Sequence, residues 1–82
     1  MATKHDLDDW VYEALKALGG RANIPSIGKY IWDHHEAELR ASGDLFYTWQ
    51  YEIRWAGQRL FKVGKMKHKG TSGRGFWELP GH

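Results

Sequence analysis

The sequence contains no cysteine and no long apolar run, and these absences exclude several classes of protein. Without cysteine, neither a disulfide nor a thiolate metal site can support a small core. No apolar run approaches the roughly 18 residues that a membrane span requires, and residues 1–5 are too few and too polar for a signal peptide. We therefore expect a cytoplasmic protein without a membrane partner.

Patterns that carry catalysis are also missing. No serine has a recognisable general base beside it, the acidic residues are not paired for hydrolysis, and the glycines of residues 70–75 lack the strand-to-helix setting of a phosphate loop. His34 and Glu38 are one helical turn apart, but no third metal ligand lies near them in the sequence. We therefore expect no enzyme activity, no cofactor and no metal.

The chain is short and rich in aromatic residues. Its 82 residues form one small domain, residues 1–82, which can bury only about 60% of its unfolded surface. Five Trp, four Tyr and three Phe must supply much of that core.

The charges are distributed unevenly along the chain. Residues 1–53 carry five Lys or Arg against nine Asp or Glu, a net charge of −4, whereas residues 54–82 carry seven against one, a net charge of +6. A basic half of this kind attracts polyanions. The alternative is a solvated basic face without a partner.

Two helices are predicted in the first half. In the first, Asp6 is the expected N-cap and Gly19–Gly20 the expected end. Its apolar residues with helical spacing are Leu7, Val11, Ala14, Leu15 and Leu18. A short strand in RANI follows, Pro25 begins the second helix, and Gly43 closes it. The apolar face of that helix is predicted to contain Ile27, Ile31, His34 or His35, and Leu39.

A third helix is predicted from Thr48, as N-cap, to Gly64. Its core seam has helical spacing and consists of Trp49, Ile53, Ala56 and Leu60. The opposite side carries flat, forked or cationic side chains, namely Gln50, Tyr51, Arg54, Trp55, Gln58 and Lys62. An ordinary solvated helix would instead mix Glu with Lys.

A β-hairpin is predicted after the third helix. Lysines alternate with Met66 and His68 over residues 65–69, three glycines lie in residues 70–75, and Trp77 and Leu79 share a face of the return strand. The order helix, short strand, helix, helix, hairpin predicts an α+β fold of the winged helix-turn-helix class.

The segment EIRWAGQRLFKVGKMK, followed by GRGFWEL, resembles the end of the winged-helix domain at the N-terminus of Mrr-type restriction proteins. In that family, a helix with an R-W-A-like segment runs into Leu, Gly, a basic strand and a Gly-aromatic-Trp-x-Leu return strand. The matching residues are Arg54, Trp55, Ala56, Leu60, Gly64, Gly75, Trp77 and Leu79. The segment ALKALGGRANIPSI resembles the family's first helix and first short strand.

A second resemblance concerns FYTWQY, which is similar to the winged-helix specificity domains of adenine-methylation-dependent restriction endonucleases. There, aromatic side chains contact the methyl group in the major groove. Together the resemblances imply double-stranded DNA as the partner, including adenine-methylated DNA, and a restriction or defence setting with a nuclease fused or partnered in a parent protein. Cleavage is not carried over, because we see no nuclease domain in these 82 residues.

The third helix has the right side chains for the major groove, where Arg reads guanine and Gln reads adenine. The predicted base-contacting residues are Tyr47, Trp49, Gln50, Tyr51, Arg54 and Gln58. The predicted contacts to the DNA backbone are Thr48, Arg59, Lys62, Lys65, Lys67, Lys69 and Arg74.

Several alternatives stay open. Trp49 can belong to the core, Trp55 can pack under the wing, and Arg59 can pair with Glu52 or another acid. The aromatic surface can also dock another protein, since folds do not determine function. A third alternative is an RNA or single-strand binder, in which exposed aromatic rings stack on bases.

Overall fold

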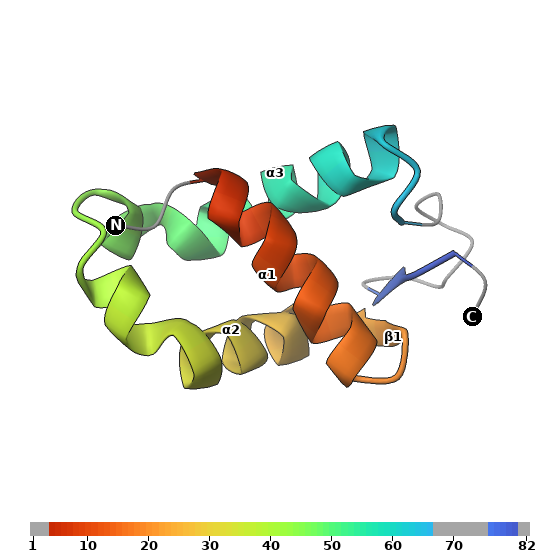
Figure 1. Ribbon diagram of the computed structural model, residues 1–82, viewed down its shortest axis with the longest axis horizontal. Helices are drawn as coiled ribbons and strands as arrows, with labels where there is room; N and C mark the ends of the chain where they lie inside the picture. Colours follow the sequence, from red (N-terminus) through yellow and green to blue (C-terminus); the bar gives the residue numbers. More distant parts are fainter. Residues whose placement is uncertain (1–3, 67–75, 81–82) are drawn as a thin grey trace.

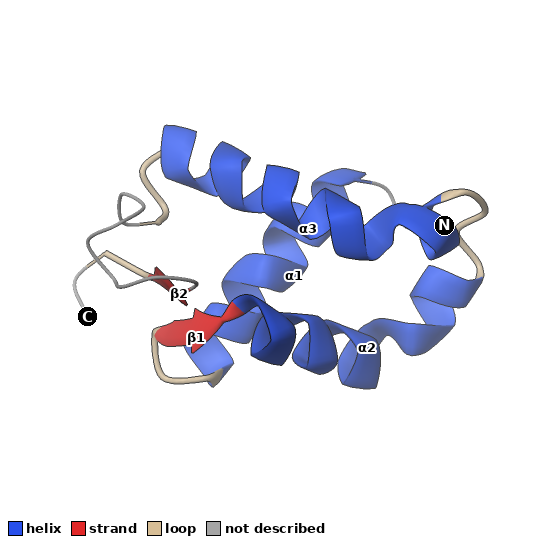
Figure 2. Ribbon diagram, turned by 180° about the vertical axis from the view of Figure 1, so that it is seen from behind, coloured by secondary structure: helices blue, strands red, loops and turns tan. Residues whose placement is uncertain are grey.

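The computed structural model describes residues 4–66 and 76–80, which form three helices and a two-stranded antiparallel sheet (Figure 1). In chain order the elements are α1 (Lys4–Ala17), β1 (Arg21–Asn23), α2 (Ile24–Arg40), α3 (Leu45–Lys62) and β2 (Phe76–Glu78). Helix α1 lies across α2 and α3 on one side of the pair, and the small sheet lies at one end of the molecule (Figures 1 and 2). Within the described segments, no helix is long and apolar enough to span a membrane.

Helix α1 supplies the centre of the core. Leu7, Val11 and Leu15 are completely buried, as their spacing predicted. The helix begins before Asp6, which therefore lies in the first turn and not at the cap; its carboxylate still faces the positive end of the helix dipole. Leu18, which has the same helical spacing, does not belong to the core. It follows the last residue of α1, and its side chain is 40% exposed.

Helix α2 begins at Ile24, one residue before the predicted start at Pro25, and is capped by Asn23. The Asn23 side chain accepts a hydrogen bond from the Ser26 amide at 2.9 Å, and Pro25 lies in the first turn, where no amide donor is required. The helix ends at Arg40, three residues before the expected stop at Gly43. It is kinked at His35, whose φ of −131° is not helical.

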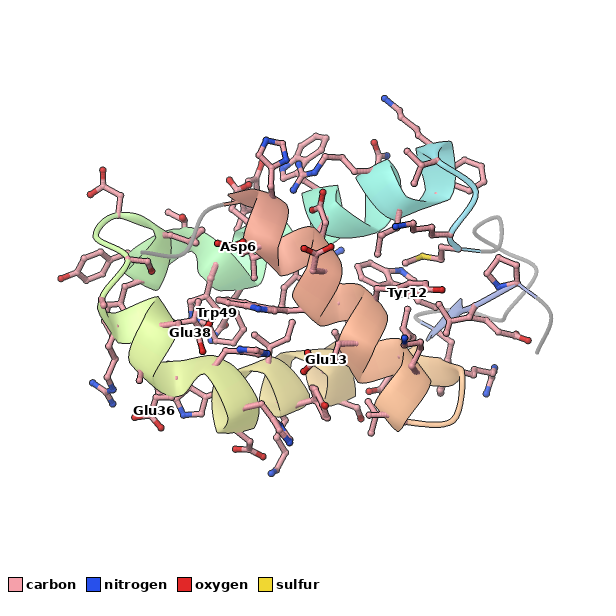
Figure 3. All side chains as sticks on the ribbon, viewed as in Figure 1. Asp6, Tyr12, Glu13, Glu36, Glu38 and Trp49 are labelled. Carbon is pink, nitrogen blue, oxygen red and sulfur yellow. The ribbon has the colours of Figure 1, made fainter. Side chains whose placement is uncertain are left out.

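The kink places His35, and not His34, against α1. Its ring stacks on Trp10 with centroids 4.1 Å apart, Nε2 lies 3.2 Å from Glu13 and Nδ1 lies 3.3 Å from Glu38. Figure 3 shows both of these carboxylates around the crossing of α1 and α2. A histidine thus joins the two helices where an apolar residue would be usual.

Helix α3 begins at Leu45, so the prediction of Thr48 as its N-cap was wrong. Residues 42–44 already form a turn in which the Leu45 and Phe46 amides donate to the carbonyls of Ser42 and Gly43, and burial of Leu45 extends the helix backward. The Thr48 hydroxyl instead donates to the Asp44 carbonyl. The predicted stop is confirmed, because Gly64 follows the last helical turn with a φ of 80°.

The described sheet pairs β1 with β2, in the register Ala22 opposite Trp77. Trp77 and Leu79 are both buried, which confirms their shared face. Residues 65 and 66 of the predicted first hairpin strand lie in a bend outside any strand, and residues 67–75 lie outside the described part of the chain. The wing is therefore still a prediction.

Trp77 packs directly on Gly57 of α3. A Cβ at Gly57 would lie 2.6 Å from the Trp77 ring, whereas a Cβ at Gly28 of α2 would meet only the Ile53 Cδ1 atom, at 3.9 Å. Gly57 is therefore required by the close approach of the sheet to α3. Gly28 has no such requirement.

Replacing Gly57 by alanine should destabilise the protein, although alanine is the better helix former. Overpacking costs about 1–3 kcal/mol and the gain in helix propensity is about 1 kcal/mol, so we expect a net loss of up to about 2 kcal/mol. The matched control, Gly28→Ala, should raise the free energy of unfolding by about 0.5–1 kcal/mol. Urea denaturation of both variants measures the difference, and equal stabilisation by the two changes would contradict the packing of Trp77 on Gly57.

Candidate nucleic-acid interface

One side of α3 is exposed along its whole length. Tyr47 is 83% exposed, Tyr51 62% and Trp55 45%, and polar or cationic side chains lie among these rings. We call this surface the α3 outer face; it consists of Tyr47, Gln50, Tyr51, Arg54, Trp55, Gln58 and Lys62. Five of the six predicted base-contacting residues belong to it.

Trp49, the sixth, lies on the other side of the helix. It is only 6% exposed, and it points inward from α3 (Figure 3). Its ring stacks parallel to Trp32 of α2 with centroids 6.0 Å apart. Trp49 therefore belongs to the core, which was one of the alternatives left open by the sequence, and its side chain is not part of the α3 outer face.

Arg59 is held by α1. Its guanidinium donates from Nε and Nη2 to the Asp8 carboxylate, with contacts of 2.8 and 2.7 Å. The hydrogen bond that Arg59 donates to Asp8 raises the pKa of the guanidinium above its ordinary value, while burial acts in the opposite direction. This ion pair joins α3 to α1. The sequence had left open that Arg59 pairs with Glu52 or another acid, and the partner in the ion pair is Asp8.

The other predicted backbone contacts have different surroundings. Thr48, Lys62 and Lys65 are exposed, and the Lys65 ammonium lies 5.5 Å from the centre of the Tyr12 ring. Lys67, Lys69 and Arg74 lie outside the described residues.

The α3 outer face carries positive charges and no negative charge. Glu52 is the only acid between residues 45 and 62, and it lies on the flank of the helix and not among the outer residues. Neither Arg54 nor Lys62 forms an ion pair with another residue of the described segments. The face thus combines unneutralised cations with the edge-on pair of Tyr51 and Trp55, whose ring centroids are 6.3 Å apart.

Beside the outer face, α2 and α3 enclose a groove of about 700 Å³. Its lining residues all belong to these two helices: Ile24, Pro25, Gly28, Lys29, Trp32, Phe46, Trp49, Gln50, Ile53 and Arg54. Gln50 and Arg54 belong to both the groove and the outer face. We call this feature the α2–α3 groove.

Sequence reasoning did not find the α2 wall of this groove. The sequence does contain a pattern that indicates this wall. Beside the buried seam of α2 runs a second row of residues with helical spacing: Pro25, Gly28, Lys29 and Trp32. The opposite wall comes from α3, and the two walls meet only through the packing of the helices.

Residues that could hold a metal are not grouped in the described segments, which contain no cluster of three or more His, Asp or Glu side chains with suitable geometry. The side chains at α3 instead offer hydrogen bonds, positive charge and aromatic surface. These are the means by which proteins recognise nucleic acids.

The chain matches no protein-family model, no curated protein and no solved structure. The resemblance to Mrr-type winged-helix domains therefore stays a prediction. The geometry of α3 and its surroundings is the basis for a functional assignment.

Proposed function

We propose that this protein is a double-stranded DNA-binding domain of the winged helix-turn-helix class, with no catalytic activity of its own. In this proposal, α3 enters the major groove and its outer face reads base edges. The basic residues that follow α3 in the sequence hold the phosphate backbone.

The observation that carries the proposal is the composition of the α3 outer face. Gln50 and Arg54 are both exposed and lie one helical turn apart on α3, and no residue of the α3 outer face is acidic. Arg and Gln are the side chains that make bidentate contacts to guanine and adenine, and an α-helix fits the major groove, which is about 12 Å wide. An ordinary solvent-facing helix would neutralise its cations with nearby acids.

The order of elements supports the same class. Helices α2 and α3 follow one another after a short strand, and β1 pairs with a strand that follows α3. This arrangement leaves α3 at the surface with the sheet at its C-terminal end (Figure 1). A winged helix-turn-helix presents its recognition helix in this way.

A competition experiment separates this proposal from its two alternatives. We expect the protein to bind a labelled random-sequence duplex, and we expect unlabelled duplex to displace it far more effectively than the matched single strands. Stronger displacement by single strands would assign the exposed aromatic rings to base stacking. Absence of binding to any nucleic acid would leave the outer face as a protein-docking surface.

A reader of N6-methyladenine is a more specific form of the same proposal. Tyr47 and Tyr51 are the most exposed aromatic rings of α3 and lie in its N-terminal half. The methyl group adds an apolar surface to the major-groove edge of adenine while one N–H donor is retained, and an aromatic surface can bury it. Burial of one methyl contributes about 0.8 kcal/mol, and two methyls on a palindromic site contribute about twice that.

We therefore expect several-fold to tens-fold tighter binding to a fully methylated duplex than to the unmethylated duplex, with the half-methylated duplex between them. Titrations of the three matched duplexes measure this preference. Tyr51→Leu, which keeps an apolar side chain but removes the ring, is the control variant. Equal affinities for all three duplexes would contradict methyl recognition and leave DNA binding itself intact.

A further inference from the structure

The α2–α3 groove has the properties of a ligand site, and its lining residues other than Gln50 and Arg54 have no part in the proposed reading of base edges. Its volume of about 700 Å³ lies within the range of about 300–1,000 Å³ that small-molecule sites occupy. Its walls carry Trp32 and Phe46, both half-buried, beside the parallel ring of Trp49. Part of this aromatic surface is therefore still exposed to solvent.

The charge of the groove is positive. Lys29 stands on the α2 wall and Arg54 on the α3 wall, and none of the lining residues is acidic. Lys29 is 2.7 Å from Asp33, whereas Arg54 has no ion pair among the described residues. Arg40, outside the lining, lies over Trp32 at 5.2 Å from its ring centre and is paired with Glu36 at 2.7 Å. Planar aromatic walls with cations at the rim suit a flat heterocycle attached to negative charge.

A nucleotide has this chemistry. Its base stacks on aromatic rings, and its phosphates accept hydrogen bonds from Arg and Lys. Gln50, at the mouth, has an amide that both donates and accepts hydrogen bonds, as the edge of a base requires. A purely apolar protein segment would leave these polar groups without partners.

The position of the groove connects it to the DNA. Gln50 and Arg54 line the groove and also belong to the α3 outer face, so a duplex held on that face would lie next to the groove. We propose that the α2–α3 groove receives one unpaired base of the bound DNA, stacked on the exposed part of Trp32, with Lys29 at a neighbouring phosphate. This inference rests on the proposed function.

Unpairing and unstacking a base costs free energy, so DNA that already contains an unpaired base should bind more tightly. The experiment compares a fully paired duplex with the same duplex carrying one bulged adenine, each titrated against the unmodified protein. We expect the bulged duplex to bind about five- to a hundredfold more tightly, which is the range that stacking of one base supports.

Gly28→Leu tests the location of the bound base. A side chain at Gly28 points toward Ile53 of the groove wall, where a Cβ is accommodated at 3.9 Å, so leucine should fill the groove without removing a core contact. Ala37→Leu places the same side chain at an exposed site on α2 that does not line the groove. We expect Gly28→Leu to bind both duplexes with equal affinity and Ala37→Leu to keep the preference for the bulge.

A second pair of variants tests the stacking platform. Trp32→Ala should lose the preference for the bulged duplex, and Trp32→Phe, which keeps a ring, should retain most of it. If Trp32→Ala does not fold, the comparison of Gly28→Leu with Ala37→Leu still decides the result.

The outcomes separate the two proposals. Absence of binding to either duplex overturns the proposed function and this inference together. Equal binding of both duplexes by the unmodified protein overturns only the inference, and so does a bulge preference that survives in Gly28→Leu. In these last two cases, the groove would be left for a protein segment.

Discussion

Replacing Trp49 by alanine should lower the free energy of unfolding by about 3–5 kcal/mol. The side chain is 6% exposed and packs in the core against Trp32, so its removal leaves a cavity at the junction of α2 and α3. Small domains have only about 5–15 kcal/mol of stability, and this change would remove a large part of it. Thermal and urea denaturation followed by circular dichroism measure the loss.

Tyr51→Ala is the matched control on the same helix. Tyr51 is 62% exposed, so we expect its removal to change the free energy of unfolding by no more than about 0.5 kcal/mol. A large loss for Tyr51→Ala with a small loss for Trp49→Ala would mean that α3 is rotated about its axis relative to the core.

Arg54→Ala should have the largest effect on sequence preference. Arg54 is exposed and forms no ion pair in the part of the chain that the structure describes, so its guanidinium is available to a base pair. A bidentate contact to guanine discriminates against other bases by about 1–3 kcal/mol, and loss of Arg54 should relax the preference at one base-pair position by this amount. A binding selection on a randomised duplex library, followed by titration of single-base variants, measures it.

Lys62→Ala is the control for a contact that does not read sequence. Lys62 lies on the same face near the end of α3, and its single charge should weaken binding to all sequences alike. Both variants should keep the melting temperature of the unmodified protein. If Arg54→Ala also weakened all sequences equally, Arg54 would be a phosphate contact.

Periodicity predicted those parts of the fold that local sequence determines. The buried residues Leu7, Val11 and Ile53 follow from helical spacing, and the ends of α1 and α3 follow from glycines with positive φ. These features depend on interactions within a few residues of the chain. Little beyond the backbone conformation and an apolar face is needed to specify them.

The errors arose where distant segments decide the structure. Helix α3 begins at Leu45 because that side chain is buried in the tertiary core, which the capping preference of Thr48 could not indicate. The kink at His35 accompanies its contacts with Trp10 and Glu13 of α1. Both positions were set by packing between helices.

The candidate site shows the same division. The exposed Tyr51, Arg54 and Gln58 follow from the helical spacing of the core seam, because the outer face is its complement. The α2–α3 groove does not follow from either helix alone, since Trp32 and Phe46 are brought together only when α2 packs on α3. The Arg59 pair with Asp8 likewise required the crossing of α3 over α1.

The salt dependence of duplex binding tests the central claim most directly. A protein that neutralises DNA phosphates releases counterions, and the slope of log K against log salt concentration is about −0.9 per phosphate contacted. For this domain we predict a slope of about −4, from about four or five phosphate contacts made by Lys62 and the basic residues that follow it in the sequence. A slope near zero, with affinity unchanged between low and high salt, would contradict the assignment of α3 as a DNA-binding helix.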